Sequence, residues 1–391
     1  MTPFLRQIPR FLGSLQLTVV LLVLSMMLVF LATMAQTRIG IWEVMSTYIR
    51  TFWVWIPVPN RDISLPVFPG GWLLGMLLLI NLAVAHAIRF RKSPRKVPML
   101  LIHGGIALLL ISELITGLFA RESDMILDVG SSKTYTQAPR EAELVIVDPS
   151  DPDRDRVWSV SESLLAQGGP ITHHNLPFRL EIDQFYQNSR VFVRGSMAAP
   201  DAEAATAGFG TRLSVVEAPR VVTTDGRNTV SAYVTVVTDD RTHGRWLLST
   251  VIDEPQYFEV NGQDYWLAIR PTRFYKPYRI HLIEFTHDRY PGTEIPRAFS
   301  SLIRLTDSER HEDREILISM NNPLRYRGET FYQASYANDD RTSILQVVRN
   351  PGWMLPYLGC VVVTAGLLWQ FIHGITRSRQ RTRSTAVSMT R

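Results

Sequence analysis

Two apolar segments joined by a short basic turn constrain this chain more than any other feature. They lie between Trp72 and Phe119, and each has about 20 residues, enough for a helix to cross the roughly 30 Å apolar core of a bilayer. The turn between them, residues 89–98, contains basic side chains and no acid: Arg89, Arg91, Lys92, Arg95 and Lys96. Because loops rich in Lys and Arg stay on the cytoplasmic side, the sequence predicts a helical hairpin with this turn inside the cell.

Each helix of the hairpin carries one histidine near the turn. His86 precedes Arg89 by three residues, and His103 follows Pro98 by five. At about 1.5 Å per residue, both imidazoles lie roughly 5–8 Å inside the cytoplasmic boundary. An ionisable group within lipid is costly and marks a functional site by default. Neutral imidazole is a good axial ligand for haem iron, so the pair is a candidate haem site. The alternative is a pair of polar residues that bond to neighbouring helices.

Further apolar segments complete a membrane region. Residues 15–35 predict a retained helix, since this run is too long for the apolar part of a usual signal peptide. The hairpin helices are predicted at about 71–90 and 99–119, which closes an N-terminal membrane region at residue 119, and a fourth helix is predicted at 351–375. Aromatic residues within 36–70, namely Trp42, Tyr48, Trp53 and Trp55, predict an amphipathic segment at the outer membrane interface.

Residues 120–350 have the composition of a soluble domain. Apolar and polar residues alternate in segments such as ELVIVD, SAYVTVVTD and RIHLIEF, and turn-forming clusters separate these segments. The pattern predicts a mainly antiparallel β domain, a sandwich or barrel, with residues 197–208 as a mobile loop. Near its end, Tyr332 and Tyr336 are predicted to pack into the core, while Asn321 and Asn322 form a turn.

The distribution of charge predicts the orientation in the membrane. The N-terminus, the 89–98 turn and the tail at 376–391 are all basic, so a single topology places all three in the cytoplasm. Four helices then place residues 120–350 outside. The formal net charge of +5 does not indicate nucleic-acid binding, because most of the excess base flanks membrane segments.

Several chemistries are excluded by missing motifs. Cys360 is the single cysteine, so an intramolecular disulfide, a CxxC redox centre and covalent c-type haem attachment to this chain are all impossible. The sequence has no GxSxG, HExxH or phosphate-binding loop. Six histidines in the β domain show no metal-ligand spacing: His173, His174, His243, His281, His287 and His311.

Other polar residues within the helices have distinct expected roles. Glu113 is ten residues beyond His103, about 15 Å away in depth, so it cannot contact the same iron. We expect it to face a partner or a cavity, or else to be held protonated by burial. Asn81 is a further intrahelical polar residue, and His373 is expected to reach the interface at the cytoplasmic end of the last helix.

The order of motifs resembles the ResB (CcsB) family of the system II cytochrome c maturation machinery, over nearly the whole chain. The similar fragments are LPVFPGGWLL leading into NLAVAH, IHGGIALLLISELITGL with ESDMILDVGSSKTY, HLIEFTHDRYPGT with IPRAFSSLIRL, and ISMNNPLRYRGETFYQASY. The resemblance implies the same layout of three helices, an outer β domain and a fourth helix. It also implies a location in the cell inner membrane, with the large domain on the periplasmic side.

The resemblance further implies a function. Such a protein acts with CcsA, a separate haem-handling membrane protein, to carry haem b across the bilayer and present it to apocytochrome c. The family's transmembrane histidine corresponds to His103, and CcsA is expected to supply the opposing axial ligand. The resemblance assigns no role to His86, which stays a candidate second ligand by depth alone. The chain is expected to be non-catalytic by itself and a subunit of a cytochrome c haem lyase complex.

The sequence also allows two other interpretations of the function. One is a membrane-anchored envelope protein whose β domain is a structural or partner-binding module without haem. The other is a permease subunit with a large external domain.

Overall fold

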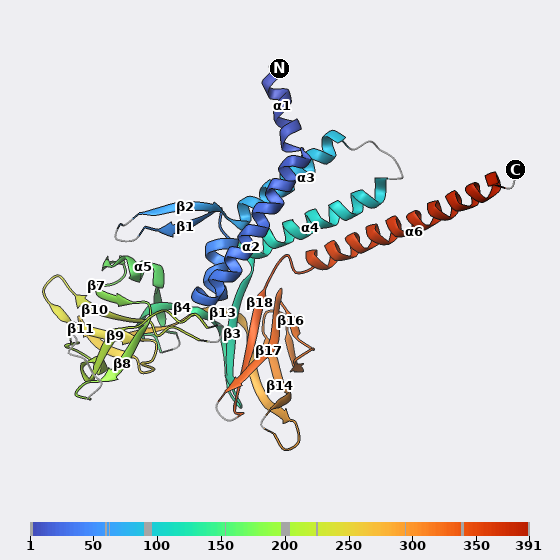
Figure 1. Ribbon diagram of the computed structural model, residues 1–391. Helices are drawn as coiled ribbons and strands as arrows, with labels where there is room; N and C mark the ends of the chain where they lie inside the picture. Colours follow the sequence, from blue (N-terminus) through green and yellow to red (C-terminus); the bar gives the residue numbers. More distant parts are fainter. Residues whose placement is uncertain are drawn as a thin grey trace. The chain divides into compact units, whose positions relative to one another are not determined.

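The structure, a computed structural model, describes residues 3–58, 61, 63–89, 96–152, 154–196, 204–223, 226–293, 295–337 and 340–389. The chain forms two compact units (Figure 1). Met1–Arg121 and Arg349–Arg391 form a helical unit, and Glu122–Val348 form a β-rich unit. The predicted architecture, with three long apolar helices before a large antiparallel β domain and one after it, is confirmed. Most of the predicted basic turn, residues 90–95, lies outside the described residues.

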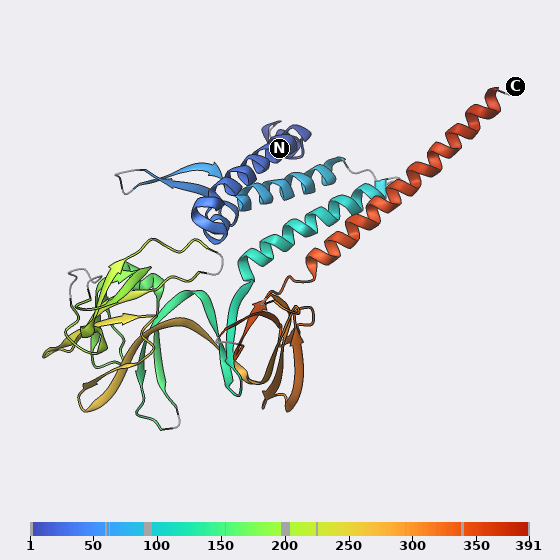
Figure 2. The same cartoon turned by 60° about the horizontal axis from the view of Figure 1, so that its bottom comes forward.

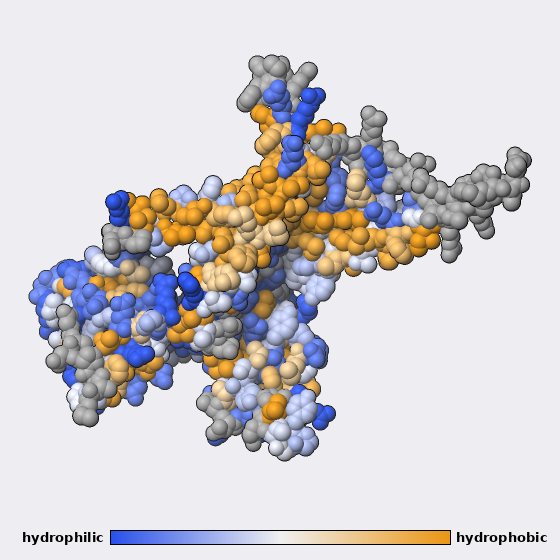
Figure 3. All heavy atoms as spheres, in the orientation of Figure 1, coloured by the Kyte–Doolittle hydropathy of each residue, from blue (hydrophilic) through white to orange (hydrophobic). Residues whose placement is uncertain are grey.

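The helical unit contains the expected apolar helices. Its helices are α1 (Pro3–Leu12), α2 (Leu15–Val44) with a π-helical turn at Met45–Ile49, α3 (Gly71–Arg89), α4 (Val97–Phe119) and α6 (Leu355–Met389). Of these, α2 with its π-helical turn, α3, α4 and the segment Leu355–Ile375 of α6 are long and apolar enough to cross a membrane. Large apolar side chains are exposed along these helices, and apolar residues cover their visible faces in Figure 3. Such a surface is suited to contact with lipid.

The segment after residue 35 differs from the prediction. Helix α2 continues to Val44 and bends at Gly40, whose φ is +76°. A β-hairpin of β1 (Trp53–Pro57) and β2 (Ser64–Pro69) then replaces the predicted amphipathic segment. The aromatic and branched residues of the WVWI run favour a strand, and this preference outweighs the helical pattern. The predicted interfacial aromatics are therefore divided between a helix end and a strand.

The last helix is longer than predicted. It begins at Leu355 and continues through the basic tail to Met389. Helices α4 and α6 lie side by side in Figures 1 and 2, and their main chains come close at three glycines. These are Gly105 on α4, and Gly359 and Gly366 on α6. Small residues allow such an approach, which is a common way to pack helices in membranes.

Every strand pair of the β-rich unit whose register the structure describes is antiparallel. The strands are β3 (Arg121–Asp128), β4 (Ser132–Asp148), β5 (Arg156–Ser161), β6 (Gly169–Ile171), β7 (Arg179–Tyr186), β8 (Ser189–Val193), β9 (Leu213–Glu217), β10 (Ser231–Val237), β11 (Thr242–Ser249), β12 (Gln256–Val260), β13 (Gln263–Arg289), β14 (Pro296–Asp307), β15 (Glu312–Ser319), β16 (Leu324–Tyr326), β17 (Glu329–Ala337) and β18 (Thr342–Arg349), with a short helix α5 (Glu162–Gln167). Strand β13 has 27 residues and pairs with both β4 and β14. Its first half packs in one apolar core and its second half in another, so β13 links the two cores.

The prediction for the stretch near residue 332 is partly wrong. Tyr332 is only half-buried, whereas Phe331 and Gln333 on either side of it are buried. Alternate residues of a strand face opposite sides of the sheet. The prediction therefore placed the inward-facing residues of this strand one position too late. Tyr336 is also half-buried, although its ring stacks near Phe285. The predicted turn is confirmed, since the main chains of Ser319 and Asn322 bond to each other across it.

The predicted mobile loop is described in part. Residues 197–203 lie outside the described residues. Residues 204–208 are packed rather than free: Ala205 is 5% exposed, and the main-chain N–H of Thr206 donates to the carbonyl of Arg245 at 2.8 Å. The alanine-rich composition of the run did not reveal this pairing with β11.

Candidate functional site

The α3–α4 hairpin brings His86 and His103 into direct contact. Nδ1 of His103 lies 3.2 Å from Nε2 of His86, and the two ring centroids are 4.9 Å apart with the rings nearly perpendicular, at 85°. Both side chains are half-buried. The two histidines can meet because few residues separate the end of α3 at Arg89 from the start of α4 at Val97, and each histidine lies close to that end of its helix. Depth alone had suggested two nearby groups, and the structure adds the hydrogen bond between them.

A second hydrogen bond fixes His86 on its own helix. Its Nδ1 lies 2.9 Å from the main-chain carbonyl oxygen of Leu82, one turn earlier on α3. The other ring nitrogen points to His103. The His86 ring is therefore held at both nitrogens.

A small apolar pocket lies beside the two histidines. Its volume is about 140 Å³, and apart from His86 and His103 it is lined by Leu79, Leu82, Ala83, Leu100, Gly104 and Ala107. Every other lining residue is aliphatic or glycine. Such a surface can receive a flat apolar molecule that also needs one nitrogen ligand.

The two glycines after His103 have different roles. A Cβ on Gly104 would meet no atom within 4 Å, so this position leaves open space at the pocket. A Cβ on Gly105 would lie 2.8 Å from the carbonyl oxygen of Gly359 on α6. Gly105 thus serves helix packing, and Gly104 keeps the pocket accessible.

Asn81 is a structural residue in the helical unit. It is 3% exposed, and its side-chain amide donates to the carbonyl oxygens of Leu12, at 2.6 Å, and Ser14, at 3.1 Å. The hydroxyl of Thr18 donates to its carbonyl oxygen at 2.6 Å. These bonds fasten the break between α1 and α2 onto α3, so burial of this amide is compensated.

Glu113 and His373 lie away from the histidine pair. A carboxylate oxygen of Glu113 is 3.7 Å from Nε of Arg50, and the glutamate side chain is 54% exposed. The sequence reading missed Arg50 as its partner, since these residues are far apart in the chain. His373 is exposed on α6 and does not line the pocket.

Two histidines of the β-rich unit, His281 and His287, serve its internal contacts. Nδ1 of His287 lies 2.7 Å from a carboxylate oxygen of Asp340, and this imidazole is 1% exposed. Burial favours the neutral acid, but hydrogen bonds from His287 and Arg289 hold the pKa of Asp340 below its usual range. His281 bonds to Ser132. Among the described residues, no group of three or more His, Cys, Asp or Glu side chains is arranged to hold a metal ion.

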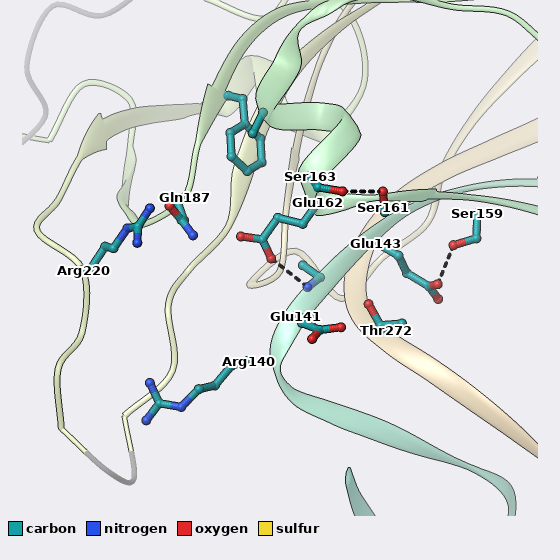
Figure 4. A pocket seen from close by; sticks show the side chains of 13 residues that line it. Arg140, Glu141, Glu143, Ser159, Ser161, Glu162, Ser163, Gln187, Arg220 and Thr272 are labelled. Carbon is teal, nitrogen blue, oxygen red and sulfur yellow. Dashed lines mark hydrogen bonds between the residues drawn. The ribbon is translucent and has the colours of Figure 1, made fainter. Parts of the chain in front are cut away.

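A polar pocket of about 650 Å³ lies beside α5 in the β-rich unit (Figure 4). Two of its carboxylates, those of Glu143 and Glu162, already have partners within the fold. The hydroxyl of Ser159 donates to Glu143 at 2.5 Å, and the main-chain N–H of Ala142 donates to Glu162 at 3.0 Å. Arg270 also pairs with Glu143, at 2.9 Å. These groups hold β4, β5 and β13 together, so the histidine pair is the stronger candidate site.

Comparison with known proteins gives two matches. A family model described as the ResB-like family matches residues 90–344, a range that includes His103 and begins after His86. Protein NrfI of Wolinella succinogenes is similar to part of the chain, with 35% identity over 113 residues. That match covers 29% of this chain and 12% of NrfI.

Proposed function

The chain belongs to the ResB-like family, and from this premise we propose that it acts in cytochrome c biogenesis as a haem-holding membrane subunit. In this proposal, haem b is the cargo, and a CcsA-type haem-handling protein is the partner. This chain and its CcsA-type partner together export haem and present it to apocytochrome c outside the inner membrane. The chain alone is non-catalytic, and the complex with the CcsA-type partner is the lyase.

One observation supports the proposal most directly: His103 lines an apolar pocket, and the space next to Gly104 in that pocket is empty. The residues present fit a haem ligand set, since an imidazole supplies the axial nitrogen and aliphatic side chains supply a flat apolar wall. Nε2 of His103 makes no hydrogen bond to any residue that the structure describes. It is the nitrogen to which we assign the iron.

The size of the pocket supports a shared site. A volume of about 140 Å³ is much smaller than a haem, so this chain can cover only part of the macrocycle. Exposed haem in lipid would leave its propionates and one axial position without protein contacts. We therefore expect a second membrane protein to cover the remaining face, which agrees with the CcsA-type partner implied by the family.

A ligand exchange experiment tests this function. The full chain is purified with its membrane partner, and the reduced complex is expected to show the sharp absorption bands of low-spin b-type haem. His103→Gly should weaken these bands, and added imidazole should partly restore them by occupying the vacated space. His373→Gly is the matched control and should leave the spectrum unchanged, because this histidine does not line the pocket.

Two results would contradict the proposal. Full retention of low-spin haem by His103→Gly without imidazole would show that His103 is a packing residue. A complex that never binds haem would favour an envelope protein whose β domain recognises a partner.

A further inference from the structure

The hydrogen bonds around His86 have a fixed direction. A main-chain carbonyl oxygen can only accept, so the contact between Leu82 and Nδ1 of His86 requires a hydrogen on that nitrogen. In the neutral ring, Nε2 of His86 then carries the lone pair. The contact of 3.2 Å to His103 must therefore be donated by Nδ1–H of His103.

This direction determines the state of the second ring. A neutral imidazole has a single N–H, so a hydrogen on Nδ1 of His103 leaves Nε2 with a free lone pair. The hydrogen bond made by one ring nitrogen sets whether the other can bind a metal, and histidine ligands in metal sites are commonly oriented in this way.

From this geometry we propose that His86 is a positioning residue, which holds His103 in the tautomer that binds iron through Nε2, and is not itself the second axial ligand. The proposal rests on the proposed function, in which His103 ligates haem. Leu82, His86 and His103 then form a chain of hydrogen bonds that ends at the iron-binding nitrogen.

The same contact excludes His86 as a second ligand in this arrangement. The lone pair on its Nε2 already accepts the hydrogen of His103, and one lone pair cannot also bind iron. Its Nδ1 is committed to Leu82. Nearly perpendicular rings at 85° suit a direct hydrogen bond between them. We therefore expect the opposing axial ligand to come from another chain.

The surroundings strengthen the assignment. The other residues that line the pocket are aliphatic or glycine, and none has a side chain that could accept the hydrogen on Nδ1 of His103 in place of His86. A variant that removes the acceptor at position 86 should thus allow His103 to carry its hydrogen on either ring nitrogen. Glutamine can substitute in part, because its amide both donates and accepts.

The first test reads the tautomer without haem. The full chain is labelled with ¹⁵N-histidine, reconstituted in lipid at pH 8, and studied by solid-state NMR, in which protonated and bare ring nitrogens resonate apart. Signals are assigned by their loss in His103→Gln and His86→Gln. We expect a hydrogen on Nδ1 of His103 in the parent chain and a mixed state in His86→Leu. A hydrogen on Nε2 of His103 in the parent chain overturns the proposal, even if haem binds.

The second test measures haem in the complex. His86→Leu should keep a low-spin spectrum but bind haem about 10–100-fold more weakly, the range typical for loss of a residue that orients a metal ligand. His86→Gln should recover most of this loss. Complete loss of low-spin haem in both variants, with helix content unchanged by circular dichroism, would identify His86 as a ligand and overturn the proposal. Haem retention by His103→Gly would instead refute the proposed function and leave the NMR result standing.

Discussion

Gly105 of α4 lies directly against Gly359 of α6, so that a Cβ on Gly105 would stand 2.8 Å from the carbonyl oxygen of Gly359. Gly105→Leu should therefore separate these helices and lower the free energy of unfolding by about 1–3 kcal/mol, the usual cost of an overpacked contact. Unfolding in SDS, followed by far-ultraviolet circular dichroism, measures the change. Gly75→Leu is the control, because its Cβ would meet no atom within 4 Å. Equal stability of the two variants would show that the approach of the helices is not required.

The neighbouring glycine should affect haem rather than folding. A leucine at position 104 would extend into the pocket beside His103, since Gly104 borders open space there. We expect Gly104→Leu to weaken haem binding about tenfold or more, because forcing methyl groups into a ligand site costs roughly 1–3 kcal/mol. Haem titration of the purified complex checks this value. Gly374→Leu, also in open space but outside the pocket, should bind haem like the parent; unchanged affinity in Gly104→Leu would place the haem elsewhere.

The helices could be predicted from sequence because lipid leaves few options. An apolar run of about 20 residues must satisfy its backbone internally, so length and composition decide the structure. The hairpin of β1 and β2 could not be found in this way. Its short aromatic strands come soon after an apolar helix. The apolar residues near this boundary fit both a helix and a strand, so the sequence does not show where the helix ends.

The β domain was predictable as a class but not in detail. Alternation of apolar residues identifies strands, yet the pairing of β13 with β4 and β14 depends on contacts far apart in sequence. In β17, both Phe331 and Tyr332 are aromatic, so composition did not decide which one faces the core. The structure assigns that place to Phe331, which is fully buried.

This assignment gives a direct comparison of neighbours. Phe331→Ala should reduce the stability of the β-rich unit by about 3–5 kcal/mol, because a buried phenyl ring is replaced by a cavity. Tyr332→Ala should cost about 1 kcal/mol or less, since this side chain is only half-buried. Urea unfolding of the full chain in mild detergent, followed by tryptophan fluorescence, measures both. A larger loss of stability in Tyr332→Ala than in Phe331→Ala would show that Tyr332, and not Phe331, faces the core.

The candidate site shows a similar limit. Depth within the membrane identified His86 and His103 as a pair from the sequence, because a short turn must bring the two helices together. Their hydrogen bond, and the bond from His86 to Leu82, depend on rotation of each helix and on side-chain conformation. Sequence spacing carries no information on either. The roles of Gly104 and Gly105 also required the position of α6.

Acid should destabilise the β-rich unit through a buried carboxylate. Asp307 is buried, which by itself would raise its pKa, but hydrogen bonds from Tyr326, at 2.6 Å, and Arg327, at 3.0 Å, hold the pKa below the usual range. A depressed pKa contributes stability that is fully present above the unfolded value of about 3.9 and lost as pH falls through the folded value. Asp307→Asn should lower stability at pH 7 and flatten its decline below about pH 4.

Chemical unfolding at a series of pH values tests this expectation. Asp313→Asn is the control, because its pair with Arg304 is about half exposed and weakened by solvent. Its pKa is also lowered, so its effect should have the same sign and a smaller size. If Asp307→Asn matched the parent chain at pH 7, the buried carboxylate would contribute no stability there.

The orientation in the membrane can be tested independently of haem. Basic residues flank the proposed cytoplasmic ends, and loops rich in Lys and Arg remain inside. We expect a reporter that is active only outside the cytoplasm to work when fused after Asp151 and to fail when fused after Arg91 or at the C-terminus. Replacing Arg91, Lys92, Arg95 and Lys96 by glutamine should weaken this bias, since the asymmetry of basic residues sets it. An inactive Asp151 fusion, together with active fusions after Arg91 and at the C-terminus, would refute the topology, and it would also place the β-rich unit on the wrong side to meet apocytochrome c.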